Sequence, residues 1–256
     1  MFRLFVLLAS ALALPTDQPL SEDFPVTDSS GNESLPEVED RIVGGSPAKL
    51  GQFPYQAALY LKDSDGKMFF CSGALIAPRY ILTAAHCIEG SIETVLVELG
   101  TIRLDDKSGG FQVYASQGFS HPNYSPKSIA NDIAVLELSK SVPMSANIQT
   151  IRLASDKLGV GVSVTLSGWG KTSSTSAVSK TLNHVKLTTI SNAVCKNYES
   201  TCSGDSGGPM VTGSGSSALH VGIVSFGSSK GCDKGYPTVY TRTAAYRAWI
   251  REHANV

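Results

Sequence analysis

The sequence predicts an all-β protein with one helix at its C-terminal end. Short runs of apolar and β-branched residues are separated by clusters of glycine, proline and serine. Several such runs at short spacing are typical of a sandwich or a barrel. The chain has 256 residues, of which 42% are hydrophobic and 17% charged, a composition that provides enough apolar material for a sizeable core.

The strand-like runs lie after residue 42. They cover residues 95–99, 133–138, 162–166, 185–190, 220–226 and 238–241. Glycine-containing stretches at residues 109–110 and 213–217 provide turns between them. Near the end of the chain, Thr243 is placed to cap a helix that has Ala245, Ala248 and Trp249 on one face.

Residues 1–13 are typical of a signal peptide. Arg3 supplies a positive charge, residues 4–9 are apolar, and residues 11–13 offer a cleavage site flanked by small residues. The apolar run is too short to span a bilayer as a helix, and a buried N-terminal core helix is the alternative. We therefore expect a secreted, extracellular protein whose cysteines pair in an oxidising compartment.

Residues 14–41 have the composition of a disordered acidic pro-segment. They carry eight acidic residues, four prolines and no basic residue before Arg41, so they bury too little apolar surface to order themselves. The chain from Ile42 onward carries a net charge of +5 without a Lys/Arg cluster, which argues against a nucleic-acid partner. No glycine-rich phosphate motif and no cysteine–histidine group with metal-ligand spacing occurs, so we expect no cofactor and no metal.

Three short segments carry candidate catalytic residues. His86 lies in Thr-Ala-Ala-His-Cys at residues 83–87, Asp132 in Asn-Asp-Ile-Ala-Val-Leu at residues 131–136, and Ser206 in Gly-Asp-Ser-Gly-Gly-Pro at residues 204–209. Taken singly, each has an ordinary structural interpretation as a surface histidine, a turn aspartate or a loop. A serine hydroxyl becomes a nucleophile only beside a base, and a neutral imidazole suits that task near neutral pH.

In the order histidine, aspartate, serine, these segments resemble the chymotrypsin/trypsin family, including its chymotrypsin-like and brachyurin-like members. Residues 41–45, Arg-Ile-Val-Gly-Gly, are similar to the activation site of that family. The resemblance runs from about Arg41 to the C-terminus. It implies two six-stranded antiparallel β-barrels with a C-terminal helix, and a serine protease domain at residues 42–256.

The resemblance also implies the role of each residue. His86 would take the proton of Ser206 and Asp132 would orient His86, while the amides of Gly204 and Ser206 would bind the oxyanion. Cleavage after Arg41 would free the Ile42 amine, which would then pair with a buried Asp205 and order the oxyanion loop.

Five cysteines are present, and the resemblance implies the pairs Cys71–Cys87 and Cys202–Cys232. Cys195 is left over. In the family a longer stretch, containing the partner of this cysteine, precedes the counterpart of Ser200, whereas only residues 196–199 intervene here. An in-frame exon skip, a gene-model error, a natural deletion and a tolerated shortening are the open explanations.

The primary specificity is expected to be apolar. By resemblance, Ser200 lies at the pocket base, where trypsin-like members have aspartate, and Gly227 leaves one wall open. Thr238 narrows the pocket, so the choice stays open between chymotrypsin-like and elastase-like preference. Ser225, Phe226 and Gly227 would pair with the substrate backbone, with Phe226 replacing the commoner tryptophan.

The leading hypothesis is a secreted serine endopeptidase made as a zymogen. Its expected partners are peptide or protein substrates, an activating protease and protease inhibitors, and we expect a monomer with no membrane partner. The alternative is a catalytically impaired homologue or splice form that acts by binding. Asn32 and Asn123 each begin an Asn-x-Ser sequon, and Asn123 is a candidate glycan site in a surface loop.

Overall fold

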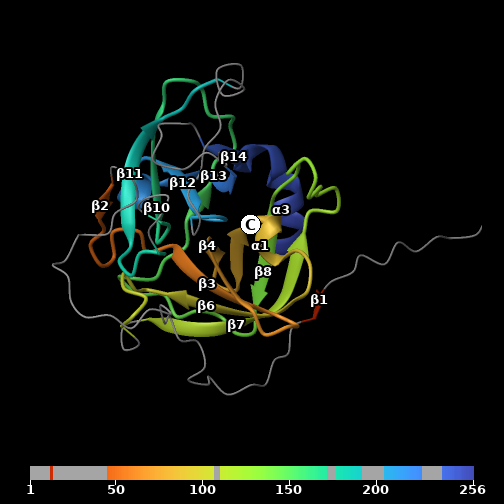
Figure 1. Ribbon diagram of the computed structural model, residues 1–256. Helices are drawn as coiled ribbons and strands as arrows, with labels where there is room; N and C mark the ends of the chain where they lie inside the picture. Colours follow the sequence, from red (N-terminus) through yellow and green to blue (C-terminus); the bar gives the residue numbers. More distant parts are fainter. Residues whose placement is uncertain (1–11, 14–44, 107–109, 172–176, 192–204, 227–237) are drawn as a thin grey trace, which may run out of the picture.

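Two antiparallel sheets and a C-terminal helix make up the computed structural model (Figure 1). It describes residues 12–13, 45–106, 110–171, 177–191, 205–226 and 238–256. Its strands are β1 (Leu12–Ala13), β2 (Ser46–Pro47), β3 (Gln56–Asp63), β4 (Met68–Ala77), β5 (Tyr80–Thr83), β6 (Ile92–Leu99), β7 (Phe111–Ser120), β8 (Ala134–Leu138), β9 (Arg152–Leu153), β10 (Ser163–Gly168), β11 (Asn183–Thr188), β12 (Pro209–Thr212), β13 (Leu219–Phe226) and β14 (Val239–Arg242). Its helical segments are α1 (Ala85–Ile88), η1 (Gly215–Ser217), η2 (Thr243–Tyr246) and α3 (Arg247–Ala254).

The first sheet closes into a six-stranded antiparallel barrel. Its strands follow the order β7-β6-β3-β4-β5-β8, and pairing between β7 and β8 completes the ring. Closure leaves the six strands without unpaired edges along the ring. Two residues, Leu12 and Ala13, add β1 to β7 opposite Gly118 and Gln117.

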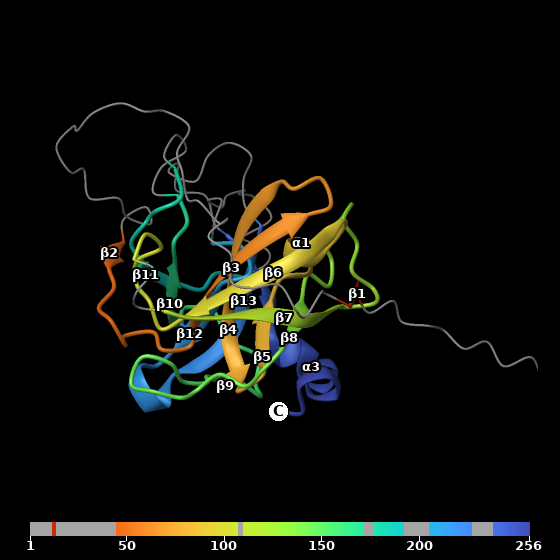
Figure 2. The ribbon, with the colours of Figure 1, turned by 90° about the horizontal axis from the view of Figure 1, so that it is seen from below.

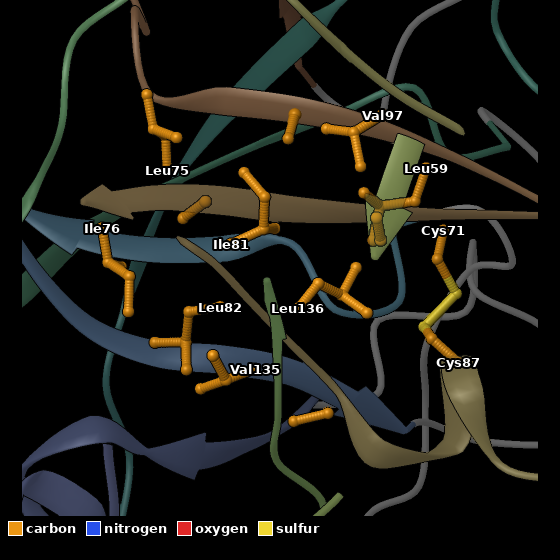
Figure 3. Close-up of a cluster of buried hydrophobic side chains, with 14 of the residues drawn as sticks. Leu59, Cys71, Leu75, Ile76, Ile81, Leu82, Cys87, Val97, Val135 and Leu136 are labelled. Atoms are coloured by element: carbon orange, nitrogen blue, oxygen red, sulfur yellow. A yellow bond between two sulfur atoms is a disulfide. The ribbon is translucent and has the colours of Figure 1, made fainter. Parts of the chain in front are cut away.

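Alternating side chains of β3 serve two different hydrophobic clusters. Leu59 and Leu61 are fully buried in the barrel core (Figure 3). Ala58 and Tyr60 instead contact the cluster that contains Trp169 and Leu182. Because successive side chains of a strand point to opposite faces, β3 is buried on both faces and joins the barrel to the second half of the protein.

The second sheet follows the order β14-β13-β12-β10-β11-β2, and β9 pairs in parallel with β13. Within the described residues its ends, β14 and β2, do not pair with each other. A hydrogen bond from Ser167 Oγ on β10 to Gln56 Oε1 on β3, 2.6 Å long and buried, connects the two sheets. The predicted all-β class is confirmed, and the first of the two predicted six-stranded barrels is closed. The second predicted barrel is present as a sheet whose ends do not pair within the described residues.

The C-terminal helix is present, but two details predicted from the sequence are wrong. Thr243 begins η2 rather than capping α3, and its hydroxyl bonds to His220 Nδ1 at 2.8 Å. Ala245 and Ala248 are exposed, whereas Trp249 is partly buried and packs against the barrel core. Ile250 and Ala254 are the buried residues of α3. The one-turn η2 shifts the helical phase, and α3 packs beside β8 (Figure 2).

Most of the predicted strand runs correspond closely to strands of the structure. Residues 95–99 lie in β6, residues 220–226 in β13, and residues 238–241 overlap β14. The run 185–190 extends too far, because β11 ends at Thr188 and Ile190 is 41% exposed. None of the helices in the described part of the chain has the length and apolar character needed to cross a membrane.

Candidate active site

Pairing between β5 and β8 brings His86 and Asp132 together. Thr83, at the end of β5, lies opposite Ala134, at the start of β8. The chain then enters α1, which carries His86, while Asp132 lies two residues before the start of β8. His86 Nδ1 lies 2.8 Å from Asp132 Oδ2, and the backbone N–H of His86 donates to Oδ1 at 2.9 Å.

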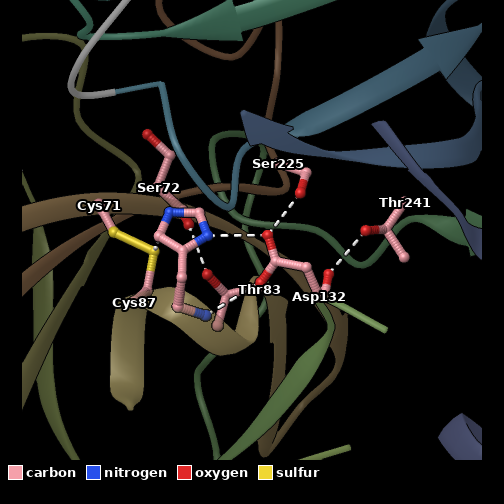
Figure 4. A network of polar contacts seen from close by, with 8 residues as sticks. Cys71, Ser72, Thr83, Cys87, Asp132, Ser225 and Thr241 are labelled. Carbon is pink, nitrogen blue, oxygen red and sulfur yellow. Dashed lines mark hydrogen bonds and ion pairs between the residues drawn. A yellow bond between two sulfur atoms is a disulfide. The ribbon is translucent and has the colours of Figure 1, made fainter. Parts of the chain in front are cut away.

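The carboxylate of Asp132 is fully buried, and two hydroxyl groups from the second sheet bond to this residue (Figure 4). Ser225 Oγ donates to Oδ2 at 2.5 Å, and Thr241 Oγ1 donates to the Asp132 carbonyl at 2.7 Å. Burial alone would raise the pKa of Asp132. The hydrogen bond and charge of His86 and the hydrogen bond from Ser225 outweigh it and hold this pKa below its ordinary value. The aspartate therefore stays ionised beside the imidazole.

Ser206 lies in a tight turn fixed between the barrel and β13. Its carbonyl accepts the N–H of Ser72 on β4 at 2.8 Å, and the N–H of Gly207 donates to Val224 O on β13 at 2.8 Å. Gly207 has a φ of 77°, and a side chain there would collide with Thr83 Oγ1 and the Ser72 carbonyl. Glycine is therefore required both for the backbone conformation and for the close approach to β4 and β5.

The same contacts place the Ser206 backbone on the side of the barrel that carries His86. Ser72 also accepts a hydrogen bond from Thr83 Oγ1 at 2.8 Å, and Thr83 is three residues before His86. Between the described side chains of Ser206 and His86 no hydrogen bond is formed, and His86 Nε2 lies 3.8 Å from Cys87 Sγ. Contacts between nucleophile and base are often loose before substrate binds.

A disulfide joins Cys71 on β4 to Cys87 in α1, as the family resemblance implied. It ties the helix that carries His86 to the barrel wall. Cys71, His86 and Cys87 are also the one His/Cys/Asp/Glu group with metal-ligand spacing among the described residues. Both sulfur atoms are committed to the disulfide, so neither is available as a thiolate, the form in which cysteine binds metals.

The arrangement combines a buried, ionised aspartate, a partly exposed histidine and the tight turn that bears Ser206. A sequence model described as "Trypsin" matches residues 42–250. The chain belongs to the trypsin family. Brachyurin of Leptuca pugilator is 36% identical over 233 residues, which cover 84% of this chain and 99% of that protein. Trypsin delta of Drosophila erecta is 33% identical, covering 98% of this chain and 99% of that one.

Similarity to a solved structure agrees with this assignment. A structure titled HL collagenase superposes with a TM-score of 0.73 at 31% identity and covers 84% of this chain and 99% of that one. The fold and the family together make the chain a serine-type endopeptidase, a hydrolase.

Asp205 is half-buried, and its carboxyl group packs against Gly168, the last residue of β10, and against Gly170. Its Oδ1 accepts the N–H of Gly170 at 2.9 Å, and a side chain at Gly168 or Gly170 would collide with the carboxyl group. Within the described residues the carboxyl forms no ion pair. Burial raises its pKa to about 7, and the bond from Gly170 opposes this rise only in part. The carboxyl group of Asp205 is thus a buried acid that lacks a positive partner here.

Some of the remaining predicted site residues lie in the described part of the chain, and the others lie outside it. Phe226 lies at the end of β13, 40% exposed, opposite Val239, and Thr238 directly precedes β14. This pairing places Phe226 and Thr238 at the same end of adjacent strands. The following predicted residues lie outside the described part of the chain: Arg41, Ile42, Ser200, Gly204 and Gly227, together with Cys195, Cys202 and Cys232.

Sequence reasoning missed several residues that fix Asp132. Ser225 was expected to act through its backbone, and nothing in the sequence indicated that its hydroxyl binds Asp132. Asn131 adopts a φ of 56°, and its side chain donates to Asn123 O at 2.8 Å and accepts from Tyr246 Oη at 2.9 Å. An asparagine before the aspartate is a weak signal, since asparagine tolerates the left-handed conformation.

Proposed function

We propose that this chain is a secreted serine endopeptidase made as an inactive precursor. In this proposal residues 1–13 are a signal peptide, residues 14–41 an acidic activation segment, and residues 42–256 the protease domain. The observation that carries the proposal is the short, charge-assisted contact between His86 Nδ1 and the buried Asp132 carboxylate in a chain of the trypsin family.

The proposed mechanism is acyl transfer through Ser206. His86 takes the proton of the Ser206 hydroxyl as this oxygen attacks the substrate carbonyl, and later gives a proton to the leaving amine. The contact with Asp132 supports this role, because a carboxylate at Nδ1 fixes the tautomer that leaves Nε2 free as the base. The amides of Gly204 and Ser206 would stabilise the oxyanion, and losing one such donor costs about 3–4 kcal/mol.

Activation would proceed by cleavage after Arg41. The new Ile42 amine would pair with Asp205 and order the neighbouring oxyanion loop. The buried carboxyl of Asp205 supports this step, because its raised pKa is the mark of an acid held without a countercharge. A positively charged group of the protein that reached this site would lower the pKa of Asp205 and restore its ionised carboxylate.

The proposed specificity is for large apolar or aromatic residues, with medium-sized apolar residues as the elastase-like variant. Ser200 brings no charge to the pocket base, Gly227 leaves the wall open, and Thr238 narrows it. Phe226, at the end of β13, is 40% exposed. This exposure supports a role for Ser225 and Phe226, at this end of β13, in pairing with the substrate backbone.

A serine-reactive organophosphonate probe tests the proposal. The full-length precursor and the protein cleaved after Arg41 would be labelled side by side, with Ser206→Ala as the matched control. We expect labelling at Ser206 only after cleavage, and hydrolysis of a peptide library after apolar residues. Loss of Ser206 or His86 should lower turnover about a millionfold.

Absence of labelling in cleaved, folded protein would refute the catalytic proposal. It would favour the impaired homologue that acts by binding, for which the shortened stretch before Ser200 is the sequence feature. Retention of a peptide substrate without hydrolysis, measured by calorimetry, would then be the expected behaviour.

A further inference from the structure

The connection between β7 and β8 contains an accessible sequon close to the catalytic aspartate. Asn123, Tyr124 and Ser125 form the tripeptide, and Asn123 lies in an exposed turn. The side chain of Asn123 makes no hydrogen bond within the described residues, so modifying its amide breaks no internal contact. N-linked glycans are bulky and occupy surface positions of this kind.

The backbone at Asn123 is nevertheless well anchored. Its N–H donates to His121 Nδ1 at 3.2 Å, and its carbonyl accepts Asn131 Nδ2 at 2.8 Å. The next residue, Tyr124, packs against the barrel core. An exposed side chain on an anchored backbone therefore places any group attached to Asn123 beside the turn that leads to Asp132.

That turn contains an exposed lysine at its tip. Ser125 N donates to Ala130 O at 3.1 Å, closing a small hairpin whose outer residues include Pro126 and Lys127. Exposed loop tips are preferred sites of proteolytic nicking. Trypsin-like proteases cleave after lysine as well as after arginine, and a cut after Lys127 would separate the segment bearing His86 from the segment bearing Asp132.

We propose that Asn123 carries an N-linked glycan, and that this glycan protects the Lys127 turn from trypsin-like proteases. The donor is a lipid-linked oligosaccharide diphosphate. The amide nitrogen of Asn123 forms a bond to the first sugar carbon, the bond from that carbon to phosphate oxygen breaks, and the amide proton and the lipid diphosphate leave. The inference rests on the proposed secretory route and is independent of catalysis.

The modification is tested on full-length protein expressed in secreting eukaryotic cells, with cell lysate and medium both analysed. An amidase that releases N-glycans converts an occupied asparagine to aspartate, which mass spectrometry assigns to Asn123 or to Asn32. We expect conversion at Asn123, lost in Asn123→Gln and Ser125→Ala but retained in Ser125→Thr, which preserves both sequon and hydroxyl.

Two negative results are distinguishable in this experiment. An intact N-terminus together with a free Cys71 thiol would mean that the chain never entered the secretory pathway, which would refute the proposed routing. A processed N-terminus with unmodified Asn123 would overturn the glycan inference alone. Either result is read from protein mass and thiol labelling, so neither depends on enzyme activity.

Protection is tested by timed digestion of the precursor with a trypsin-like protease. Native protein, protein treated with the glycan-releasing amidase, and Asn123→Gln are compared, and cuts after Arg41 and Lys127 are followed separately. We expect faster cleavage after Lys127 in both unglycosylated samples, unchanged cleavage after Arg41, and loss of the extra cut in Asn123→Gln/Lys127→Gln. Equal cleavage after Lys127 with and without the glycan would overturn the protective role.

Discussion

Asp132 illustrates how one carboxylate depends on residues scattered along the chain. It receives hydrogen bonds from the backbone and ring of His86 and from Ser225, while its carbonyl accepts Thr241. Charge-assisted hydrogen bonds are about twice as strong as neutral ones, so these donors offset the cost of burying the charge. The aspartate can therefore orient His86 without taking its proton.

His220 is a buried histidine outside the candidate active site, and its burial affects how stability depends on pH. It is fully buried, its Nδ1 bonds to Thr243 Oγ1, and its Nε2 has no hydrogen-bond partner among the described residues. Burial lowers its pKa to about 3, whereas the unfolded chain has the ordinary value near 6.5. Below about pH 6.5 the unfolded state therefore binds a proton that the folded state does not.

We predict that His220 lowers the free energy of unfolding as the pH becomes acidic. Stability attributable to His220 is present above about pH 6.5 and is lost as pH falls toward 3, by at most about 1.4 kcal/mol per pH unit. His220→Gln keeps a polar group for Thr243 but does not titrate. Urea unfolding between pH 4 and pH 7 should show a shallower acid slope in the variant, and parallel slopes would contradict the prediction.

At the scale of elements, the β4–β5 pair determines where the turn that bears Ser206 can lie. Ser72 and Thr83 come from these two strands and contact the turn that bears Ser206. Gly73, next to Ser72, faces Ile81 and Leu59 in the barrel core. A shift of either strand would therefore move both the His86 helix and the Ser206 turn.

Gly73→Ala should destabilise the protein by about 1–3 kcal/mol through overpacking. A Cβ at this position would lie 2.6 Å from Ile81 Cγ2 and 3.2 Å from Leu82 O, and neither the branched methyl group nor the carbonyl can move away freely. Gly159→Ala is the matched control, since the nearest atom to its Cβ is Val162 Cγ2 at 3.8 Å. Thermal unfolding of both variants tests this prediction, and equal unfolding midpoints would contradict it.

At the scale of the whole molecule, the site lies between two halves that fold from different parts of the chain. His86 and Asp132 belong to the barrel, whereas Ser206, Ser225 and Asp205 belong to the second sheet and its loops. The buried hydrogen bond between Ser167 and Gln56 helps to hold these halves in register. Geometry at the site therefore depends on the interface as much as on either half.

The Asp205→Asn substitution should stabilise the precursor at high pH but prevent labelling by the organophosphonate probe after cleavage. In the precursor, a carboxyl pKa raised to about 7 contributes stability that is complete below about pH 4 and is lost as pH rises toward 7. The variant should abolish this dependence and make the precursor more stable than wild type at pH 8. Denaturant titrations at pH 4 and pH 8 measure it.

After cleavage at Arg41, the same variant should remain folded but fail to react with the organophosphonate probe, because the Ile42 amine has lost its partner. Removing one member of a buried ion pair costs about 3–5 kcal/mol. Full labelling of cleaved Asp205→Asn protein would refute the activation step while leaving the stability prediction in place.

The strand runs, the C-terminal helix, and the Cys71–Cys87 pair were all accessible from sequence, the last through family resemblance. Local patterns encode them, because strand periodicity, turn residues and motif spacing depend on neighbours in the chain. The face of α3 was mispredicted because η2 changes the phase before the helix begins. A short 3₁₀ segment leaves no comparable periodic signal.

By itself the sequence determined the all-β class and named His86 and Asp132 as candidates for one site. Only the tertiary structure decided that the Ser225 hydroxyl binds Asp132, that Thr243 serves His220 rather than a helix end, and that the carboxyl group of Asp205 is buried without an ion pair in the described part. Such contacts join residues far apart in the chain, so they depend on how sheets pack and not on any local pattern.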